Sequence, residues 1–448
     1  MKPNILFIVI DSLRADYCNG EKKTSRTPNI DFLINKGVYF KQAISSIDGT
    51  FGSLGCIFTA KYPFKNNITW SKNHKNALGF FKNIKSYGYS EYLAAPANPF
   101  FKTISEDFDD KDLTSNVSYL GLWEGIGELI LSRLADGNMQ SPWIYYTHIM
   151  DLHTLKPLPE EFNIEKYGKT EYDRRISLID NWLGKFLKKI DLSKTLVILT
   201  ADHGEFVHDL DVHPEYVPTL QKFFKNGKKI TPNFLTPAGI KIFESVRTII
   251  KKRRMAKYEK SLSVEELRTL TERGRGILFD DVLRVPLILS GCGINRHSMV
   301  SQQVRHIDIL PTLESIIGTF HNQKVDGRSL IAVLNGEIID DLPVYIESTP
   351  KLDEQVGDNI GIRTSKYKYW RSRKNPKENV VLFDLESNPL EITNISNKHP
   401  SIVSQMEQSL LEIIGDDTND IHDELSDDEL SDDEYIKTRN ELKKLGYI

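Results

Sequence analysis

A short apolar run near the start of the chain is the feature that most constrains its fold. Residues 5–10 are continuously apolar and rich in β-branched side chains, and Asp11 follows directly. An apolar run of this length without alternation is typical of a strand that is buried on both faces, as in a parallel sheet. Because ligands collect at the carboxyl ends of parallel strands, Asp11 is a candidate site residue.

Similar apolar runs recur along the chain, and sequences with helical periodicity lie between them. Strands that alternate with helices predict an α/β fold, in which helices cover both faces of a large, mostly parallel mixed sheet. The expected strands are residues 5–10, 38–40, 143–147, 195–200 and 285–290, and the expected helices include 31–37, 171–188 and 307–317.

The charge balance gives no reason to expect a general affinity for polyanions. The chain has 448 residues with 58 basic and 62 acidic side chains, which is a net charge of −4 at pH 7. We therefore expect no nucleic-acid partner. No apolar run reaches the roughly eighteen residues of a membrane span, and residues 5–10 are too short for a signal peptide. Three widely separated cysteines favour a reducing compartment, so the sequence predicts a cytoplasmic protein.

Two segments depart from the average composition. Residues 219–276 are strongly basic, whereas residues 416–434 are strongly acidic and contain a tandem repeat of Glu-Leu-Ser-Asp-Asp-Glu. We interpret the first as an inserted helical excursion and the second as a solvated tail. The basic insertion suits an anionic substrate, a membrane surface in peripheral contact, or the acidic tail, within one chain or between the copies of a homo-oligomer.

A compact polar motif follows the strand that is expected at residues 195–200. Asp202, His203 and Gly204 stand together, so a carboxylate, an imidazole and a turn-forming glycine share one strand tip. Asp11 follows another strand of the same predicted sheet. Carboxylate and imidazole side chains in this combination favour a divalent metal ion. Acids that are hydrogen-bonded for structural reasons are the alternative.

Several further segments occur in an order that is typical of one family. They are residues 3–16, 27–31, 37–40, 202–205, 283–287, 306–312, 326–330, 366–369, 382–385 and 445–447. Through them the chain resembles the sulfatase-like family of the alkaline phosphatase superfamily over nearly its whole length. The resemblance implies a catalytic domain at residues 1–356, interrupted by the insertion at about 219–276. A smaller α+β subdomain at 357–415 would follow, and then an acidic tail with a terminal helix at 416–448.

The resemblance also indicates a nucleophile. In the family it lies twelve residues before a Tyr-Pro pair, and Tyr62-Pro63 therefore places it at Thr50. Sulfatases proper carry a cysteine or serine here, in a Cys-x-Pro-x-Arg context that is converted to formylglycine. Residues 50–54 lack that cysteine, the proline and the arginine, so we do not expect formylglycine. Family members with threonine are typically phosphotransferases or phosphodiesterases, and a structural threonine in a Gly-rich turn is the alternative.

One divalent metal ion is implied by the same resemblance. We expect Asp11, Thr50, Asp202 and His203 to hold it, with Mn²⁺ as the first choice and Ca²⁺, Mg²⁺ and Zn²⁺ as alternatives. Ser12 replaces the second aspartate of sulfatases, as in the phosphonate and phosphodiester hydrolases that tend to use one ion. Coordination lowers the pKa of a hydroxyl group and so turns a poor nucleophile into a useful one.

A leaving alkoxide needs a proton, and the family places a histidine for this purpose after a central strand. His153 is the matching residue and our candidate for the general acid, with His148 or Asp151 to orient it or to contact the substrate. A histidine with only a core or surface role is the alternative.

Three other residues are candidates for contacts with the transferred group. His208 and His213 follow the metal motif at distances where relatives place a further histidine or lysine, although their local spacing differs from the family pattern. Arg14 follows Asp11 closely, so its guanidinium would either contact oxygens of the substrate or pair with Asp16.

These features together predict a metal-dependent hydrolase of anionic esters. The favoured interpretation is a phosphoester or phosphodiester hydrolase that forms phospho-Thr50. The alternatives are a sulfatase, a phosphotransferase with a glycan or lipid acceptor, and a catalytically silent binding protein that docks through its insertion and tail.

Overall fold

A computed structural model of the chain describes residues 2–66, 68, 79–97, 99–114, 121–135, 137, 139–152, 157–207, 277–294, 296–319, 324–349 and 358–415. The chain divides into two units, one made of Met1–Glu205 and Gly276–Ile448 and the other of Phe206–Arg275. All helices and strands named below belong to the first unit. The predicted basic insertion and the predicted acidic tail lie outside the described residues.

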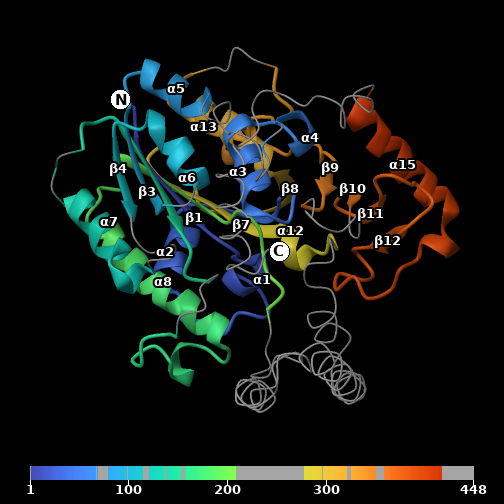
Figure 1. Ribbon diagram of the computed structural model, residues 1–448, viewed down its shortest axis with the longest axis horizontal. Helices are drawn as coiled ribbons and strands as arrows, with labels where there is room; N and C mark the ends of the chain where they lie inside the picture. The colour runs from blue at the N-terminus through green and yellow to red at the C-terminus, as the bar shows by residue number, and fades with distance from the viewer. Residues whose placement is uncertain are drawn as a thin grey trace, which may run out of the picture. The chain divides into compact units, whose positions relative to one another are not determined.

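An eight-stranded sheet forms the centre of the first unit (Figure 1). Its order is β4-β3-β5-β1-β6-β7-β2-β8, and among these strands only β7 runs antiparallel to its neighbours. The apolar β1 lies between β5 and β6 and is buried along nearly its whole length. The strands are β1 (Asn4–Ile10), β2 (Val38–Ile44), β3 (Ser90–Pro96), β4 (Asp110–Thr114), β5 (Trp143–Ile149), β6 (Thr195–Thr200), β7 (Arg284–Gly291) and β8 (Ser298–Arg305).

Helices cover both faces of this sheet (Figure 1). On one face α8 packs against α2 and α7, and on the other α3 packs against α5 and α13. The helices are α1 (Ala15–Cys18), α2 (Pro28–Lys36), α3 (Thr50–Thr59), α4 (Pro63–Asn66), α5 (Gly79–Ser86), α6 (Pro99–Ile104), α7 (Ile126–Ala135), α8 (Glu171–Leu187), α12 (Asp280–Leu283), α13 (Ile309–Ile317), α14 (Ile331–Leu334) and α15 (Pro400–Ile414). Short 3-10 turns are η2 (Ser105–Asp107), η3 (Leu122–Glu124), η4 (Glu165–Tyr167), η6 (His306–Asp308) and η7 (Ser396–Lys398).

A second, antiparallel sheet of four strands follows in the order β12-β11-β10-β9, with α15 against β10 and β11 (Figure 1). It includes β9, which lies upstream of residue 357, so the sheet takes in a strand from the part that the sequence assigned to the catalytic domain. A parallel bridge between Ile47 and Glu347 joins β9 to the segment before α3. The strands are β9 (Val344–Glu347), β10 (Asn359–Arg363), β11 (Tyr367–Ser372) and β12 (Val381–Asp384).

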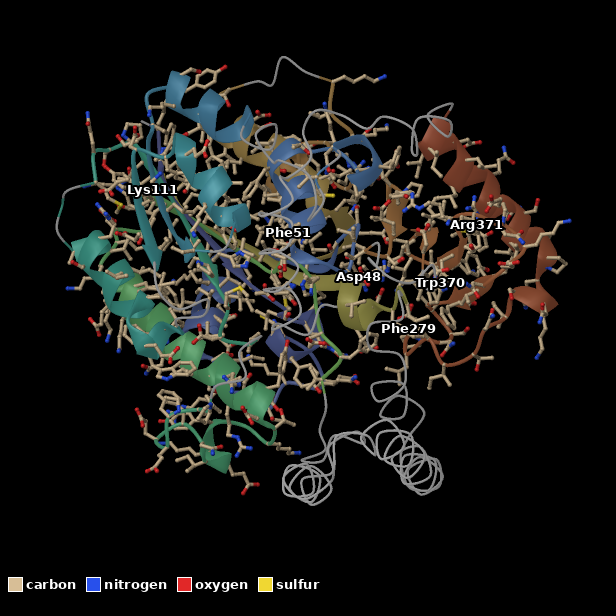
Figure 2. All side chains as sticks on the ribbon, viewed as in Figure 1. Asp48, Phe51, Lys111, Phe279, Trp370 and Arg371 are labelled. Atoms are coloured by element: carbon tan, nitrogen blue, oxygen red, sulfur yellow. The ribbon has the colours of Figure 1, made fainter. Side chains whose placement is uncertain are left out.

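Aromatic and charged contacts attach this small sheet to α12. Phe279, which immediately precedes α12, meets Trp370 of β11 edge to face with ring centroids 5.5 Å apart (Figure 2). Asp280 forms ion pairs with Arg363 at 2.8 Å and with the fully buried Lys368. These contacts fix the position of residues 279–283, which follow the second unit in sequence.

The predicted α/β architecture is confirmed, and each of the five expected strands lies within an observed strand. The helix that we expected at residues 307–317 begins differently, because residues His306–Asp308 form the turn η6 and the α-helix starts at Ile309. The Asp308 carboxylate accepts the backbone N–H of Arg305 at 2.9 Å, which stabilises the tighter turn. None of the helices in the described ranges has the length and apolar character needed to cross a bilayer.

Candidate active site

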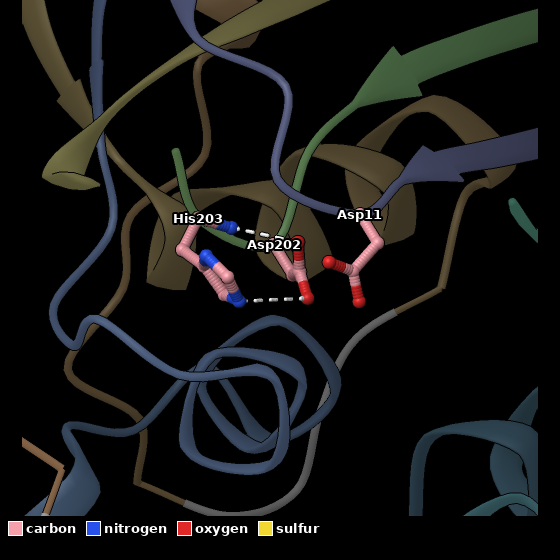
Figure 3. A group of neighbouring side chains, drawn as sticks. All are labelled: Asp11, Asp202 and His203. Atoms are coloured by element: carbon pink, nitrogen blue, oxygen red, sulfur yellow. Dashed lines mark hydrogen bonds and ion pairs between the residues drawn. The ribbon is translucent and has the colours of Figure 1, made fainter. Parts of the chain in front are cut away.

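Two neighbouring strand ends bring together three of the predicted metal ligands (Figure 3). Asp11 follows β1, and Asp202 and His203 follow β6, which pairs with β1 in parallel. One ligand atom from each of the three side chains lies within 4.8 Å of the other two. All three residues are buried. The shared edge of parallel strands therefore places two carboxylates and one imidazole at a single point.

The turn after β1 orients both carboxylates. Ser12 has a left-handed backbone, with φ at 63°, and its N–H donates to Oδ1 of Asp202 at 3.1 Å. Its hydroxyl donates to Oδ1 of Asp11 at 2.8 Å. The N–H of His203 also donates to Oδ1 of Asp202, at 2.8 Å. Oδ2 of Asp202 is buried and has no hydrogen-bond partner among the described residues, so it is available to a further ligand.

The imidazole of His203 is held with one nitrogen facing the two carboxylates. Nδ1 lies 2.7 Å from the carbonyl oxygen of Gly204, to which it donates, so Nε2 faces the site. Nε2 lies 3.6 Å from Oδ2 of Asp202 (Figure 3). Burial opposes the charge of this ring, but the carboxylates of Asp202 and Asp11 outweigh burial and raise the pKa of His203 to about 9.

Thr50 begins α3 and extends its hydroxyl toward the same point. Its Oγ1 donates to Oδ2 of Asp11 at 3.3 Å and lies 3.3 Å from Nε2 of His203. Gly49 is the N-cap of the helix, and a Cβ at this position would lie 2.4 Å from Oγ1 of Thr349. A glycine at position 49 therefore lets the chain enter α3 beside Thr349, with Thr50 as the first helical residue.

These residues fit a divalent cation. Burial, together with the neighbouring charge of Asp11, raises the pKa of Asp202. A cation beside the two carboxylates would oppose both effects. Oδ2 of Asp202 and Nε2 of His203 are the kinds of atoms that coordinate such an ion. We therefore assign Asp11, Asp202 and His203 as a candidate metal centre, with Thr50 Oγ1 as a fourth oxygen beside it.

The structure places His148 behind Asp11. Its Nε2 lies 3.4 Å from Oδ2 of Asp11, and its Nδ1 lies 3.0 Å from the hydroxyl of Tyr146. The ring packs on Phe101, with centroids 4.6 Å apart. His148 is thus one of the residues that surround the candidate metal centre, and its suggested contact with the substrate or with His153 stays a prediction.

Arg14 has the partner that the sequence analysis gave as the alternative to substrate. Its guanidinium binds Asp16 at 2.7 Å and forms a second ion pair with Asp281 of α12. Its Nη1 also donates to the backbone oxygen of Glu205 at 3.2 Å. These bonds connect the loop after β1 to the loop that follows His203, so Arg14 has a structural role in the described site.

Asp151 follows β5 and is fully buried, and both of its carboxylate oxygens accept the N–H of Leu122, at 3.1 and 3.2 Å. Burial raises the pKa of this carboxyl to about 7. The remaining predicted site residues, His153, His208 and His213, lie outside the described residues, and their roles stay predictions.

Three buried residues near the site were missed by the sequence analysis. The hydroxyl of Tyr172 donates to the carbonyl of Ser12 at 2.6 Å and so fixes the turn after β1. Ser53 and His306 contact each other beside the backbone of Asp202. The one available signal was the segment at residues 306–312, which belongs to the family pattern but was given no role in the site.

Comparisons with known proteins identify the family of the chain. A model of the family described as "Sulfatase" matches residues 3–319. The chain belongs to the sulfatase family. A second model, described as "N-sulphoglucosamine sulphohydrolase, C-terminal", matches residues 274–416 of this sulfatase-family chain.

Individual relatives differ in how much of the chain they cover. Arylsulfatase K of Bos taurus is 32% identical over 144 residues, which are 31% of this chain and 26% of that protein. The match thus spans about a quarter of arylsulfatase K. Choline-sulfatase of Rhizobium meliloti (strain 1021) is 28% identical over 460 residues, covering 90% of this chain and 84% of the relative.

A solved structure supports the fold assignment. The phosphonate monoester hydrolase of Agrobacterium radiobacter superposes with a TM-score of 0.65, at 15% identity, and the match covers 92% of this chain and 95% of that one. The architecture of this sulfatase-family chain is therefore the alkaline-phosphatase-like fold, with a large mixed sheet and a small antiparallel C-terminal sheet.

Proposed function

We propose that this sulfatase-family chain is a metal-dependent hydrolase of phosphate esters, that phosphodiesters are its preferred substrates, and that Thr50 is its nucleophile. The observation that carries the proposal is the position of Thr50 Oγ1, 3.3 Å from both Asp11 Oδ2 and His203 Nε2. A hydroxyl at this point is within reach of an ester that binds at the candidate metal centre.

The chemistry of a threonine nucleophile favours phosphate over sulfate. An aldehyde hydrate such as formylglycine releases its sulfate ester by elimination, whereas the ester of a threonine must be cleaved by water or another acceptor. The sequence around Thr50 lacks the cysteine, proline and arginine of the formylglycine motif. A phosphoester of threonine that water hydrolyses is the intermediate compatible with these residues, and with a diester substrate it keeps the second ester group.

Asp11, Asp202 and His203, with Thr50, would hold one divalent cation, for which we propose Mn²⁺. When bound, the cation would lower the pKa of the Thr50 hydroxyl and polarise a phosphoryl oxygen. The anionic group would lie beside the start of α3, where the helix dipole favours negative charge.

The proposed reaction has two in-line steps. In the first, the Thr50 hydroxyl releases its proton to solvent, the Oγ–P bond forms, and the bond from phosphorus to the leaving oxygen breaks. His153, which we propose as the general acid, protonates that leaving oxygen. In the second step His153 takes a proton from water, the new O–P bond forms and the Oγ–P bond breaks, and Thr50 recovers a proton from solvent.

Turnover of a panel of nitrophenyl esters by the full chain with Mn²⁺ tests this proposal. We expect bis(p-nitrophenyl) phosphate to be hydrolysed faster than p-nitrophenyl sulfate. Thr50→Val should lower kcat by about 10³-fold or more, whereas Thr50→Ser should retain measurable activity. Acid quenching with a phosphodiester that is radiolabelled at phosphorus should trap the label on Thr50, as a phosphoester that keeps the second ester group of the substrate. Equal turnover by the wild type and Thr50→Val would contradict the proposed nucleophile.

A sulfate-ester hydrolase is the second candidate, and the family match favours it. Sulfate turnover above phosphodiester turnover in the same panel would establish this alternative in place of the first.

The two remaining functional alternatives predict different results in the same assay. Transfer of phosphate to added glycerol in preference to water would indicate a phosphotransferase, and no turnover of any ester would indicate a binding protein.

A further inference from the structure

Three segments that are distant in sequence meet at the side chain of Ser53. Ser53 is fully buried and lies on α3, three residues after Thr50. Its hydroxyl lies 2.5 Å from the backbone carbonyl oxygen of Asp202, at the end of β6. It also lies 3.1 Å from Nδ1 of His306, in the turn η6. The helix that carries Thr50 is therefore tied directly to the peptide of a candidate metal ligand.

The direction of these hydrogen bonds follows from the number of protons. Ser53 has one hydroxyl proton, and the Asp202 carbonyl can only accept, so Ser53 donates to Asp202. Nδ1 of His306 must then carry a proton and donate to Ser53. The hydroxyl of Ser45, 3.3 Å from Ser53, donates to the carbonyl of Ile47 at 2.8 Å. The result is a directed chain from His306 through Ser53 to the carbonyl of Asp202.

His306 is well suited to a fixed role of this kind. Its side chain is fully buried, and burial lowers the pKa of His306. The ring is thus neutral and keeps one N–H donor. The turn η6 is also held by an ion pair that does not involve Ser53, because the Arg305 guanidinium binds the Asp308 carboxylate at 2.6 Å. The position of the imidazole therefore comes from a rigid turn.

We propose that Ser53 and His306 are positioning residues that set the distance between the Thr50 hydroxyl and the metal ligands Asp202 and His203. This inference rests on the proposed function of Thr50 and the candidate metal centre. Groups that orient metal ligands from behind typically change metal affinity or activity by roughly 10–100-fold when they are removed. A catalytic group also has to be held within about 0.5 Å of its working position.

Amide replacements of His306 provide the sharpest test. The side-chain N–H of asparagine can occupy the position of Nδ1, whereas the longer glutamine places its N–H near the position of Nε2. We expect Ser53→Ala, His306→Leu and His306→Gln to weaken Mn²⁺ binding by roughly 10–100-fold and to lower kcat more than they change KM. His306→Asn should recover most of both losses. Mn²⁺ affinity is measured without substrate, from the signal of free Mn²⁺ in electron paramagnetic resonance.

Thr312→Val is the matched control for a purely structural effect. The hydroxyl of Thr312 is buried and donates to the carbonyl of Asp308 at 2.6 Å, on the side of η6 that leads into α13. We expect this variant to lower the melting temperature as His306→Leu does, but to leave Mn²⁺ affinity and kcat unchanged. Parallel losses of melting temperature and Mn²⁺ affinity in Thr312→Val would contradict the positioning role.

Two further outcomes would overturn the inference. One is wild-type Mn²⁺ affinity and kcat in folded Ser53→Ala and His306→Leu. The other is recovery by His306→Gln that equals recovery by His306→Asn. If the wild type binds Mn²⁺ but hydrolyses no ester, the proposed function fails, and the order of Mn²⁺ affinities still decides the positioning role. A wild type that does not bind Mn²⁺ contradicts both.

Discussion

The guanidinium of Arg14 and the carboxylate of Asp281 form an ion pair in which both side chains are only 6% exposed. Arg14 belongs to the loop that follows β1, and Asp281 belongs to α12. The next residue, Val282, accepts the N–H of Gly204 through its carbonyl at 2.9 Å. One ion pair and one backbone hydrogen bond therefore hold α12 against the loops that carry Asp11 and His203.

Removal of one partner of this buried pair should be costly. We expect Asp281→Ala to lower the free energy of unfolding by about 3 kcal/mol, because it removes one of the two carboxylates that pair with the buried Arg14 charge among the described residues. The double variant Arg14→Met/Asp281→Leu should lose less than the sum of the single variants. Urea unfolding at pH 7 gives both values, and additive losses would argue against coupling. Lys194→Gln, which breaks an exposed pair with Asp191, should leave the free energy of unfolding nearly unchanged.

The second partner of Arg14 should make stability depend on pH. Burial opposes the charge of Asp16, but Arg14 outweighs it and lowers the pKa of this carboxyl from 3.8 to about 2. A pKa that is lower in the folded state adds stability above pH 4, which is lost as the pH falls from about 4 to 2. Asp16→Asn should thus cost about 2 kcal/mol at pH 7. The difference in the free energy of unfolding between the wild type and Asp16→Asn should narrow as the pH falls below about 4. A difference that does not change with pH would contradict the lowered pKa of Asp16 as its cause.

Gly204 should tolerate no side chain. A Cβ at this position would lie 2.1 Å from the carbonyl oxygen of Asp281. We expect Gly204→Ala to destabilise the fold by about 1–3 kcal/mol and to weaken Mn²⁺ binding, because the loop after His203 must move. Gly88→Asn is the control. The backbone of Gly88 has a φ of 81°, which asparagine tolerates, and a Cβ added there would meet no other atom within 4 Å. Equal Mn²⁺ affinities in the two variants would show that the loop relaxes without moving His203.

Removal of divalent ions should lower both activity and thermal stability. An ion that binds only the folded state adds about 2.7 kcal/mol at one hundred times its Kd. We expect EDTA to lower the melting temperature and added Mn²⁺ to restore it, as measured by differential scanning fluorimetry. The melting temperature of Asp202→Asn should not rise when Mn²⁺ is added, because this substitution removes a charge from the candidate metal centre. A rise equal to that of the wild type would exclude Asp202 as a ligand.

The central part of the fold could be predicted from the sequence, but its edges could not. Strands that are buried on both faces, such as β1 and β6, have continuous apolar runs that identify them directly. The edge strands β4 and β8 were missed because they are short of apolar residues, with sequences Asp-Lys-Asp-Leu-Thr and Ser-Met-Val-Ser-Gln-Gln-Val-Arg. Only their hydrogen bonds to β3 and β2 define them as strands.

The same contrast applies to the site. Asp11, Asp202 and His203 could be grouped in advance, because all of them follow strands of one sheet. The contact between Ser53 and His306 could not, since it depends on how η6 packs against α3 across 253 residues of sequence. The partner of Arg14 stayed open for a similar reason, because Asp281 lies on an element that has no strand pattern of its own.

The place of β1 between β5 and β6 has a consequence for synthesis on the ribosome. β1 precedes both of its neighbours in the sequence, so its hydrogen bonds are complete only once Thr200 has been translated. Until then the apolar segment from Asn4 to Ile10 is exposed on the nascent polypeptide, where chaperones that bind apolar segments can reach it. Catalytic competence would arrive later still, after His306 has left the exit tunnel.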